Sequence, residues 1–240
     1  MSIIFNEKEH AKKVIKKGIQ TPRSKGRELQ LAANYLREEG YNDKQIELEL
    51  HRISKKSFSD YNKVSMYEFI DRRVKRSKKG KLKTNEPVNI TEAEMKIILG
   101  EENVKYQKLM FVYLVLAKFY MENNHTDKYY VGCSDTEIFK LCDMYTSRQE
   151  KREMMHYLTK KGYIEPTRRM SSIVKYVDED SNVVMKIVPD ETMVYSFEKE
   201  YLDGIFINCE RCGKLAKKTS NRMKYCKDCA REIHNSGTQI

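Results

Sequence analysis

The chain has 240 residues, of which 46 are lysine or arginine and 35 are aspartate or glutamate, so its formal net charge is +11. Hydrophobic residues make up 40% of the sequence, which is enough for a packed core and excludes a wholly disordered chain. The longest apolar stretch, residues 109–120, is interrupted by Lys118 and is shorter than the ~18 residues of a membrane span. The N-terminus lacks the apolar segment of a signal peptide, so we expect a soluble intracellular protein with no membrane partner.

The charge is unevenly distributed along the chain. Residues 1–85 carry 22 basic and 11 acidic side chains, residues 86–208 carry 16 and 21, and residues 209–240 carry 8 and 3. The net charges are therefore +11, −5 and +5. Together with a linker-like basic stretch at residues 78–87, this distribution predicts three units: a basic helical domain with its linker (1–85), a middle domain (86–208) and a basic tail (209–240).

The first unit is predicted to hold short helices. Residues 1–20 are either a short helix or an arm, and a helix that ends at Gly40 follows. A capping box of Asn42 and Gln45 opens the next helix, and Ser65 is expected to open another. The turn at Gly40, which joins two of these helices, is typical of a helix-turn-helix. The long loop before the helix expected at Ser65 is not typical of that motif, so a plain helical bundle is the competing interpretation.

The end of this unit is strongly basic, with eight cations between residues 72 and 83. A cluster of this kind indicates a polyanionic partner. Four of these side chains are candidate nucleic-acid contacts, namely Arg72, Arg73, Lys75 and Arg76.

The middle unit shows a regular order of predicted elements. Ser/Thr-x-x-Glu patterns predict helix starts at Thr91, Ser134 and Ser147. The segment YQKLMFVYLVLAKFY is apolar almost all round, which predicts a buried helix. Strands are predicted near residues 129–131, 163–164, 172–177 and 183–188.

Helix, short strand, two helices and a β-hairpin is the order of a winged helix. Residues 105–188 resemble such domains, and YLTKKGYIE is similar to the end of their third helix as it enters the first wing strand. The phrases DTEIFKL and YCKDCA also resemble uncharacterised proteins encoded by prophages of low-GC Gram-positive bacteria. The resemblance implies the cytoplasm of a bacterial host as the location.

A winged helix would bring its third helix into the major groove of DNA, with the N-terminal residues of that helix at base edges. Those candidates are Arg148, Gln149, Lys151 and Arg152. Arg168 and Arg169 would lie at the tip of the wing, where they would reach the DNA backbone or minor groove. The competing interpretation is that these basic side chains are merely solvated, because the unit is acidic overall and many winged helices bind proteins.

The tail carries the most specific motif of the chain. Two C-x2-C pairs, Cys209 with Cys212 and Cys226 with Cys229, have the spacing of a four-cysteine zinc module. Four thiolates complete a tetrahedral Zn²⁺ site and leave no position for a substrate, so the metal would be structural. Disulfides are the alternative, and an intracellular location argues against them. The loop between the pairs holds three further candidate nucleic-acid contacts, Lys217, Lys218 and Arg222.

The expected fold is mainly α with a small β wing: an N-terminal helical domain, a central winged helix and a C-terminal zinc ribbon. The sequence contains no phosphate-binding glycine loop, dinucleotide fingerprint or H-E-x-x-H motif, so we do not expect an enzyme. The leading hypothesis is a phage or mobile-element protein that binds double-stranded DNA in transcription regulation or replication initiation. The alternatives are a protein-binding inhibitor or adaptor that docks a host nucleic-acid machine, and an RNA-binding regulator.

Overall fold

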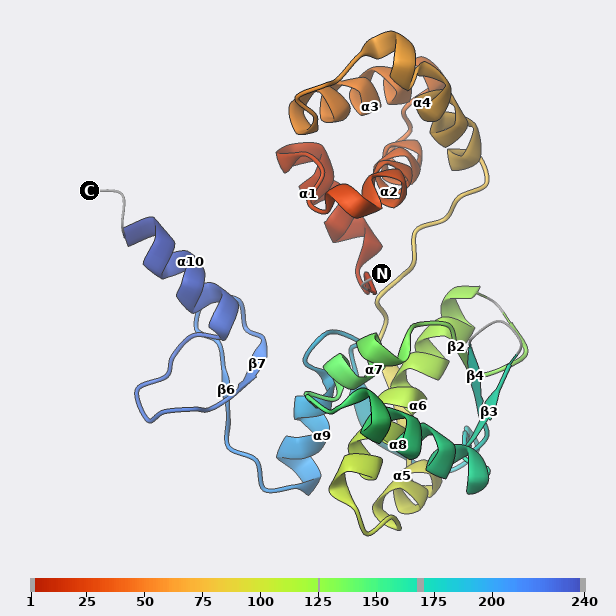
Figure 1. Cartoon of the computed structure of the whole chain (residues 1–240), viewed down its shortest axis with the longest axis vertical. Coiled ribbons are helices and arrows are strands. Elements are labelled where there is room, and N and C mark those ends of the chain that lie inside the picture. Colours follow the sequence, from red (N-terminus) through yellow and green to blue (C-terminus); the bar gives the residue numbers. More distant parts are fainter. Residues whose placement is uncertain (1–2, 125, 168–170, 238–240) are drawn as a thin grey trace. The chain divides into compact units, whose positions relative to one another are not determined.

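The computed structural model describes residues 3–124, 126–167 and 171–237 (Figure 1). The chain is mainly α-helical with small antiparallel sheets, which confirms the fold class predicted from the sequence. It divides into two compact units, Met1–Asn85 and Glu86–Ile240, so the cysteine-bearing tail is grouped with the middle of the chain. Among the described residues, no helix combines the length and the apolar composition needed to cross a membrane.

The first unit is a bundle of helices around one core. Its elements are α1 (Glu7–Lys17), a short 3-10 turn (Pro22–Ser24), α2 (Lys25–Glu38), α3 (Asp43–Ser57) and α4 (Lys63–Ser77). All four α-helices contribute to the core through buried side chains that include Val14, Leu29, Ile46, Leu50 and Ile70. Residues 7–17 thus form a packed helix and not a detached arm.

Helix starts in the first unit follow their capping side chains. The capping box of Asn42 and Gln45 at α3 is present as predicted. The predicted start at Ser65 is wrong, because Asn62 caps α4 instead: its side chain accepts hydrogen bonds from the backbone N–H groups of Val64 and Ser65. Asparagine is among the strongest N-cap residues, so it sets the start of α4.

The second unit begins with strand β1 and contains the apolar helix at its centre. Its elements are β1 (Val88–Thr91), α5 (Glu92–Leu99), α6 (Val104–Asn124), β2 (Tyr130–Val131), α7 (Asp135–Leu141), α8 (Arg148–Lys160), β3 (Ile164–Pro166), β4 (Ser172–Val174), β5 (Val183–Ile187), α9 (Met193–Tyr201), β6 (Phe206–Asn208), β7 (Leu215–Lys217) and α10 (Lys227–Gly237).

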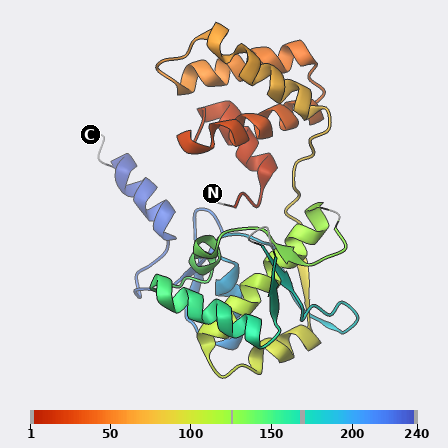
Figure 2. The same ribbon diagram turned by 45° about the vertical axis from the view of Figure 1, so that its right-hand side comes forward.

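Helix α6 is buried around its whole circumference, as its sequence predicts. Every residue from Leu109 to Ala117 is buried. The helix contacts α5, α7 and α9 as well as strands β1, β2 and β4, and it can be followed through the second unit in Figures 1 and 2. Because α6 is apolar on all sides, the other elements can pack around it as a common core.

Within the described residues, three small antiparallel sheets accompany the helices. Strand β4 lies between β2 and β3, with Tyr130 opposite Ile173 and Ile164 opposite Val174. The strand expected near residues 183–188 is present as β5, and it pairs with β1, for which the sequence pattern gave no prediction. The third sheet, β6 with β7, carries the first cysteine pair.

Candidate metal centre and basic surfaces

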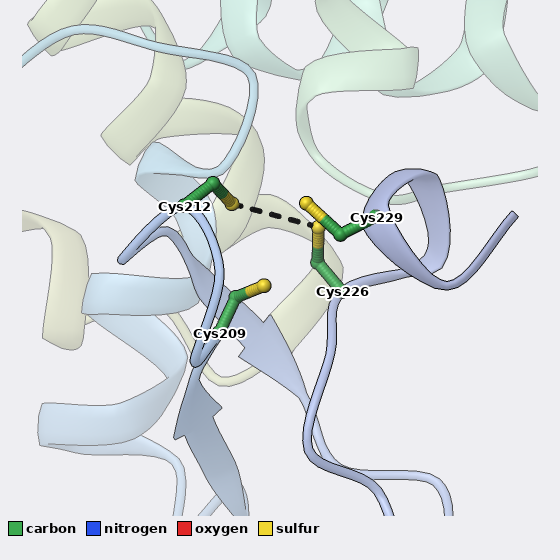
Figure 3. A group of neighbouring side chains, drawn as sticks. All are labelled: Cys209, Cys212, Cys226 and Cys229. Carbon is green, nitrogen blue, oxygen red and sulfur yellow. Dashed lines mark hydrogen bonds between the residues drawn. The ribbon is translucent and has the colours of Figure 1, made fainter. Parts of the chain in front are cut away.

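The four cysteines of the tail converge (Figure 3). Cys209 directly follows β6 and Cys212 lies in the loop to β7, whereas Cys226 directly precedes α10 and Cys229 lies in its first turn. Their four Sγ atoms all lie within 4.8 Å of one another. The Sγ atoms of Cys212 and Cys226 are 3.7 Å apart. Zn–S bonds of about 2.3 Å in a tetrahedron separate the sulfurs by about 3.8 Å, so this group could hold a metal ion of that kind.

A tight turn brings the first pair together. The backbone N–H of Gly213 donates to the carbonyl of Cys209 (2.8 Å), and the N–H of Cys209 donates to the carbonyl of Lys214 (2.9 Å). Gly213 has a φ of +72°, a left-handed conformation that glycine adopts without steric cost. Figure 3 shows the sulfurs of Cys209 and Cys212 on the side of this turn that faces Cys226 and Cys229.

The thiols of this group differ in their surroundings. Hydrogen bonds from the backbone N–H groups of Cys226 and Cys212 lower the pKa of Cys209 to about 6. Burial, with the neighbouring thiols, raises the pKa of Cys229 to about 12 in the metal-free arrangement. Metals bind thiolates, so a bound cation would favour deprotonation of all four sulfurs.

The two remaining cysteines belong to the packing of the second unit. Cys142 is fully buried and Cys133 is half-buried. Burial raises the pKa of Cys133 to about 12 and raises the pKa of Cys142 as well. Among the described residues, neither cysteine belongs to a group that could hold a metal ion, and a buried free cysteine packs like a small hydrophobic residue.

The cysteine-bearing hairpin is packed on α9. Lys217 of β7 lies 3.1 Å from the buried carboxylate of Glu198. The rings of Phe206 and Tyr195 have centroids 5.5 Å apart. These contacts account for the grouping of the tail with the second unit.

Helix α8 presents basic side chains in its first two turns. Arg148 and Arg152 are exposed, and within the described residues neither side chain makes a hydrogen bond or an ion pair. The amide of Gln149 donates to the carboxylate of Glu153 (2.8 Å). Lys151 is half-buried, with its ammonium 5.4 Å from the ring centroid of Phe139 in α7. Of the four candidates on α8, the two arginines are therefore the most available for a partner.

The N-terminus of α8 is capped as predicted, with one difference. The Ser147 side chain accepts the N–H of Glu150 at 3.1 Å. The carboxylate of Glu150 does not complete a capping box but lies 2.6 Å from the ammonium of Lys105 in α6. Arg168 and Arg169, expected at the tip of the wing, lie outside the described residues.

The basic run of α4 is divided between different sides of the helix. Arg72 donates to the carbonyl of Glu68 (3.2 Å), and Lys75 pairs with Asp71 (2.7 Å). Arg73 turns toward α2 instead, where its Nε donates to the carbonyl of Gly26 (3.1 Å). The run is continuous in sequence, but it does not form one continuous cationic stripe.

The three candidate nucleic-acid contacts of the tail differ in how accessible their side chains are. Lys217 is held by Glu198, and the backbone N–H of Lys218 donates to the carbonyl of Ile205 (2.8 Å). Arg222 is exposed in the loop between the two cysteine pairs. Of these three side chains, Arg222 is the most accessible.

Sequence reasoning missed polar residues of α2 that lie beside Arg73. They are Arg27, Gln30 and Asn34, which line a common pocket with α4. The available signal was their spacing, because residues at i, i+3 and i+7 share one face of a helix.

A comparison of the chain with protein-family models, with curated proteins and with solved structures found no match. The geometry of the described residues is therefore what supports a function.

Proposed function

We propose that the chain is a DNA-binding protein that reads duplex DNA with α8 of a winged helix. The order α6, β2, α7, α8, β3 and β4 supports this proposal, as does the sheet order β2-β4-β3. In a winged helix the third helix, here α8, is the one that enters the major groove, and the hairpin that follows it forms the wing.

The observation that carries the proposal is the pair Arg148 and Arg152. They are one helical turn apart, exposed, and without a partner in the described part of the chain. A planar guanidinium can make two hydrogen bonds to a guanine edge, a contact worth about 1–3 kcal/mol of discrimination. Gln149 could read adenine in the same way once it leaves Glu153.

The cysteine module is proposed to hold Zn²⁺ in a structural role. Four thiolates satisfy a tetrahedral zinc ion completely, so no open position remains for water or substrate. The first pair comes from a hairpin turn and the second from the start of a helix, which suits the treble-clef form of a zinc module. The metal would fix the tail in the conformation that packs on α9.

The process that we propose is transcription regulation or replication initiation in a phage or mobile element. The resemblance of DTEIFKL and YCKDCA to prophage-encoded proteins supports this setting. Phosphate contacts would come from the basic residues of the first unit and of the tail, because such contacts position a protein without reading sequence.

The test compares two double variants by selection from a randomised duplex library and by fluorescence anisotropy. Arg148→Ala/Arg152→Ala removes the proposed reading side chains. Lys96→Ala/Lys199→Ala removes the same number of charges from exposed positions on α5 and α9. We expect the first variant to lose at least tenfold in affinity for the selected sequence and to relax its preference. Equal losses in the two variants, or none in either, would contradict the proposal.

The second candidate is a protein-binding adaptor that docks a host nucleic-acid machine. Tyr145, 92% exposed just before α8, favours it, because exposed tyrosines are frequent anchors of protein interfaces. Capture of a host protein that survives nuclease treatment and is lost in Tyr145→Ser, with DNA affinity unchanged, would favour this candidate over DNA binding.

A further inference from the structure

The first unit contains an open pocket between α2 and the end of α4. Its volume is about 450 Å³, which lies within the usual range of ligand sites, about 300–1,000 Å³. Its lining includes the cations Arg27, Arg73, Arg76 and Lys79 and the amides Gln30 and Asn34. No carboxylate is among the described residues that line it.

The cations of the pocket are poorly neutralised within the chain. Arg76 and Lys79 have no ion pair among the described residues. Arg27 has a carboxylate at 3.7 Å, that of Glu7. Arg73 is held by the Gly26 carbonyl and by the Phe69 ring, whose centroid is 4.4 Å from the guanidinium carbon. The pocket therefore concentrates positive charge that an anion would neutralise.

The shape of the pocket is set by polar groups and by a glycine. The Gln30 amide donates to Asn34 Oδ1 (2.9 Å) and to the Arg73 carbonyl (3.2 Å), which fixes its orientation. Its Oε1 is buried and has no hydrogen-bond partner in the described part of the chain. A Cβ at Gly80 would lie 2.5 Å from the buried Asn34 side chain, so the close approach of the backbone here requires glycine.

We propose that this pocket binds a chain of phosphate groups. Arg73 is fixed in place by its contacts and would act as the preorganised fork, with Arg76 and Lys79 closing on the oxygens. The phosphates would belong either to a nucleic-acid backbone or to a free polyphosphate. The pocket is independent of DNA reading by α8, because all its lining residues belong to the first unit.

Burial, and after it the charges of Arg76 and Arg72, lower the pKa of Arg73. A bound anion would relieve the repulsion among these cations. Phosphate is well matched to such a group, because its oxygens accept several charge-assisted hydrogen bonds at once.

The test uses the full chain with matched double variants. Arg76→Gln/Lys79→Gln removes two cations that line the pocket, whereas Lys96→Gln/Lys199→Gln removes two cations from exposed positions of the second unit that do not line it. Gly80→Ala changes the pocket without changing the charge. Circular dichroism and thermal melting establish that each variant is folded. The probes are inorganic tripolyphosphate, followed by calorimetry, and a short DNA duplex, followed by anisotropy.

We expect the pocket variant to weaken binding of at least one probe by about tenfold or more, as the loss of two charge-assisted contacts implies. The control should change by less than about twofold, and Gly80→Ala should weaken binding as well. Equal losses in both double variants would mean a diffuse charge effect and would overturn the proposal. No effect of the pocket variant on either probe would also overturn it.

The two probes distinguish the sources of phosphate. Tripolyphosphate that binds the wild type and is displaced by duplex DNA indicates a nucleic-acid backbone. Tripolyphosphate that binds without competition from DNA indicates a free polyphosphate. The variant Arg148→Ala/Arg152→Ala should keep full affinity for tripolyphosphate, so a failure of DNA reading by α8 and a failure of this pocket give different results.

Discussion

The carboxylate of Glu198 in α9 lies 3.1 Å from the ammonium of Lys217 in β7, and so joins the cysteine-bearing hairpin to the helices of the second unit. The same carboxylate lies 2.5 Å from the ammonium of Lys108 in α6. The Glu198 side chain is 6% exposed and that of Lys108 is 11% exposed, whereas the Lys217 side chain is 49% exposed. The inner ion pair is thus shielded from water and the outer one is not.

Replacing Glu198 by glutamine should destabilise the second unit. The substitution keeps the volume of the side chain but leaves the buried ammonium of Lys108 without its counter-charge, at a cost of about 3 kcal/mol. Lys217→Gln is the matched control and should cost about 0–1 kcal/mol, because the ammonium that it removes is solvated and Glu198 keeps its ion pair with Lys108. Urea unfolding measures both free energies. Equal costs for the two variants would mean that burial does not distinguish the two pairs.

Removal of the metal should loosen the tail and leave the rest of the second unit folded. The tail comprises only residues 209–240, and a segment of that length has too little core to fold by itself, so a metal would supply much of its folding free energy. Hydrogen exchange with and without a chelator is the measurement. Exchange should rise in β6, β7 and α10 and stay slow in α6. A rise throughout α6 would show that the metal stabilises the whole unit.

The buried pair of Lys118 and Glu94 should be strongly coupled. Lys118 Nζ lies 2.8 Å from Glu94 Oε1 and donates to the carbonyl of Asn89 (2.7 Å), and the two side chains are 5% and 0% exposed. Lys118→Met would leave a buried carboxylate unpaired and should cost about 3–5 kcal/mol.

Adding Glu94→Gln to Lys118→Met should recover part of that loss, because the unpaired charge disappears. Urea unfolding of both single variants and of the double variant completes the cycle. Additive losses would show that the two side chains act independently.

Local signals in the sequence predicted local structure well. The capping boxes at Asn42 and Thr91 are present, because both partners lie within one turn of the same helix. The pattern at Ser147 correctly predicts the N-cap of α8. It does not predict the partner of Glu150, whose carboxylate pairs with Lys105 of another helix. Strand β1 was missed because its partner β5 lies more than ninety residues further along the chain, and no local pattern records that pairing.

The difference between local signals and contacts of distant segments also explains which sites could be predicted from the sequence. The cysteine group was predictable because the ligand type and the C-x2-C spacing are both visible in the sequence. The pocket of the first unit was not, because Arg27 and Gln30 come from one helix and Arg73 from another more than forty residues away. The basic run of α4 predicted charge, but packing decided which of its side chains line the pocket.

The stability of the first unit should fall as the pH drops through the titration of His51. The imidazole of this α3 residue is 8% exposed, and its Nδ1 is 2.8 Å from the Tyr61 hydroxyl. Burial lowers the pKa of His51 below its ordinary value of 6.5, although the nearby Glu47 acts in the opposite direction. The unfolded chain therefore binds a proton before the folded one does, and the stabilisation present above pH 6.5 is lost as the pH falls toward the lower folded pKa. Urea unfolding between about pH 7.5 and about pH 5 should show a smaller loss in His51→Gln than in the wild type. Identical pH profiles for the two proteins would show that His51 is not the responsible group.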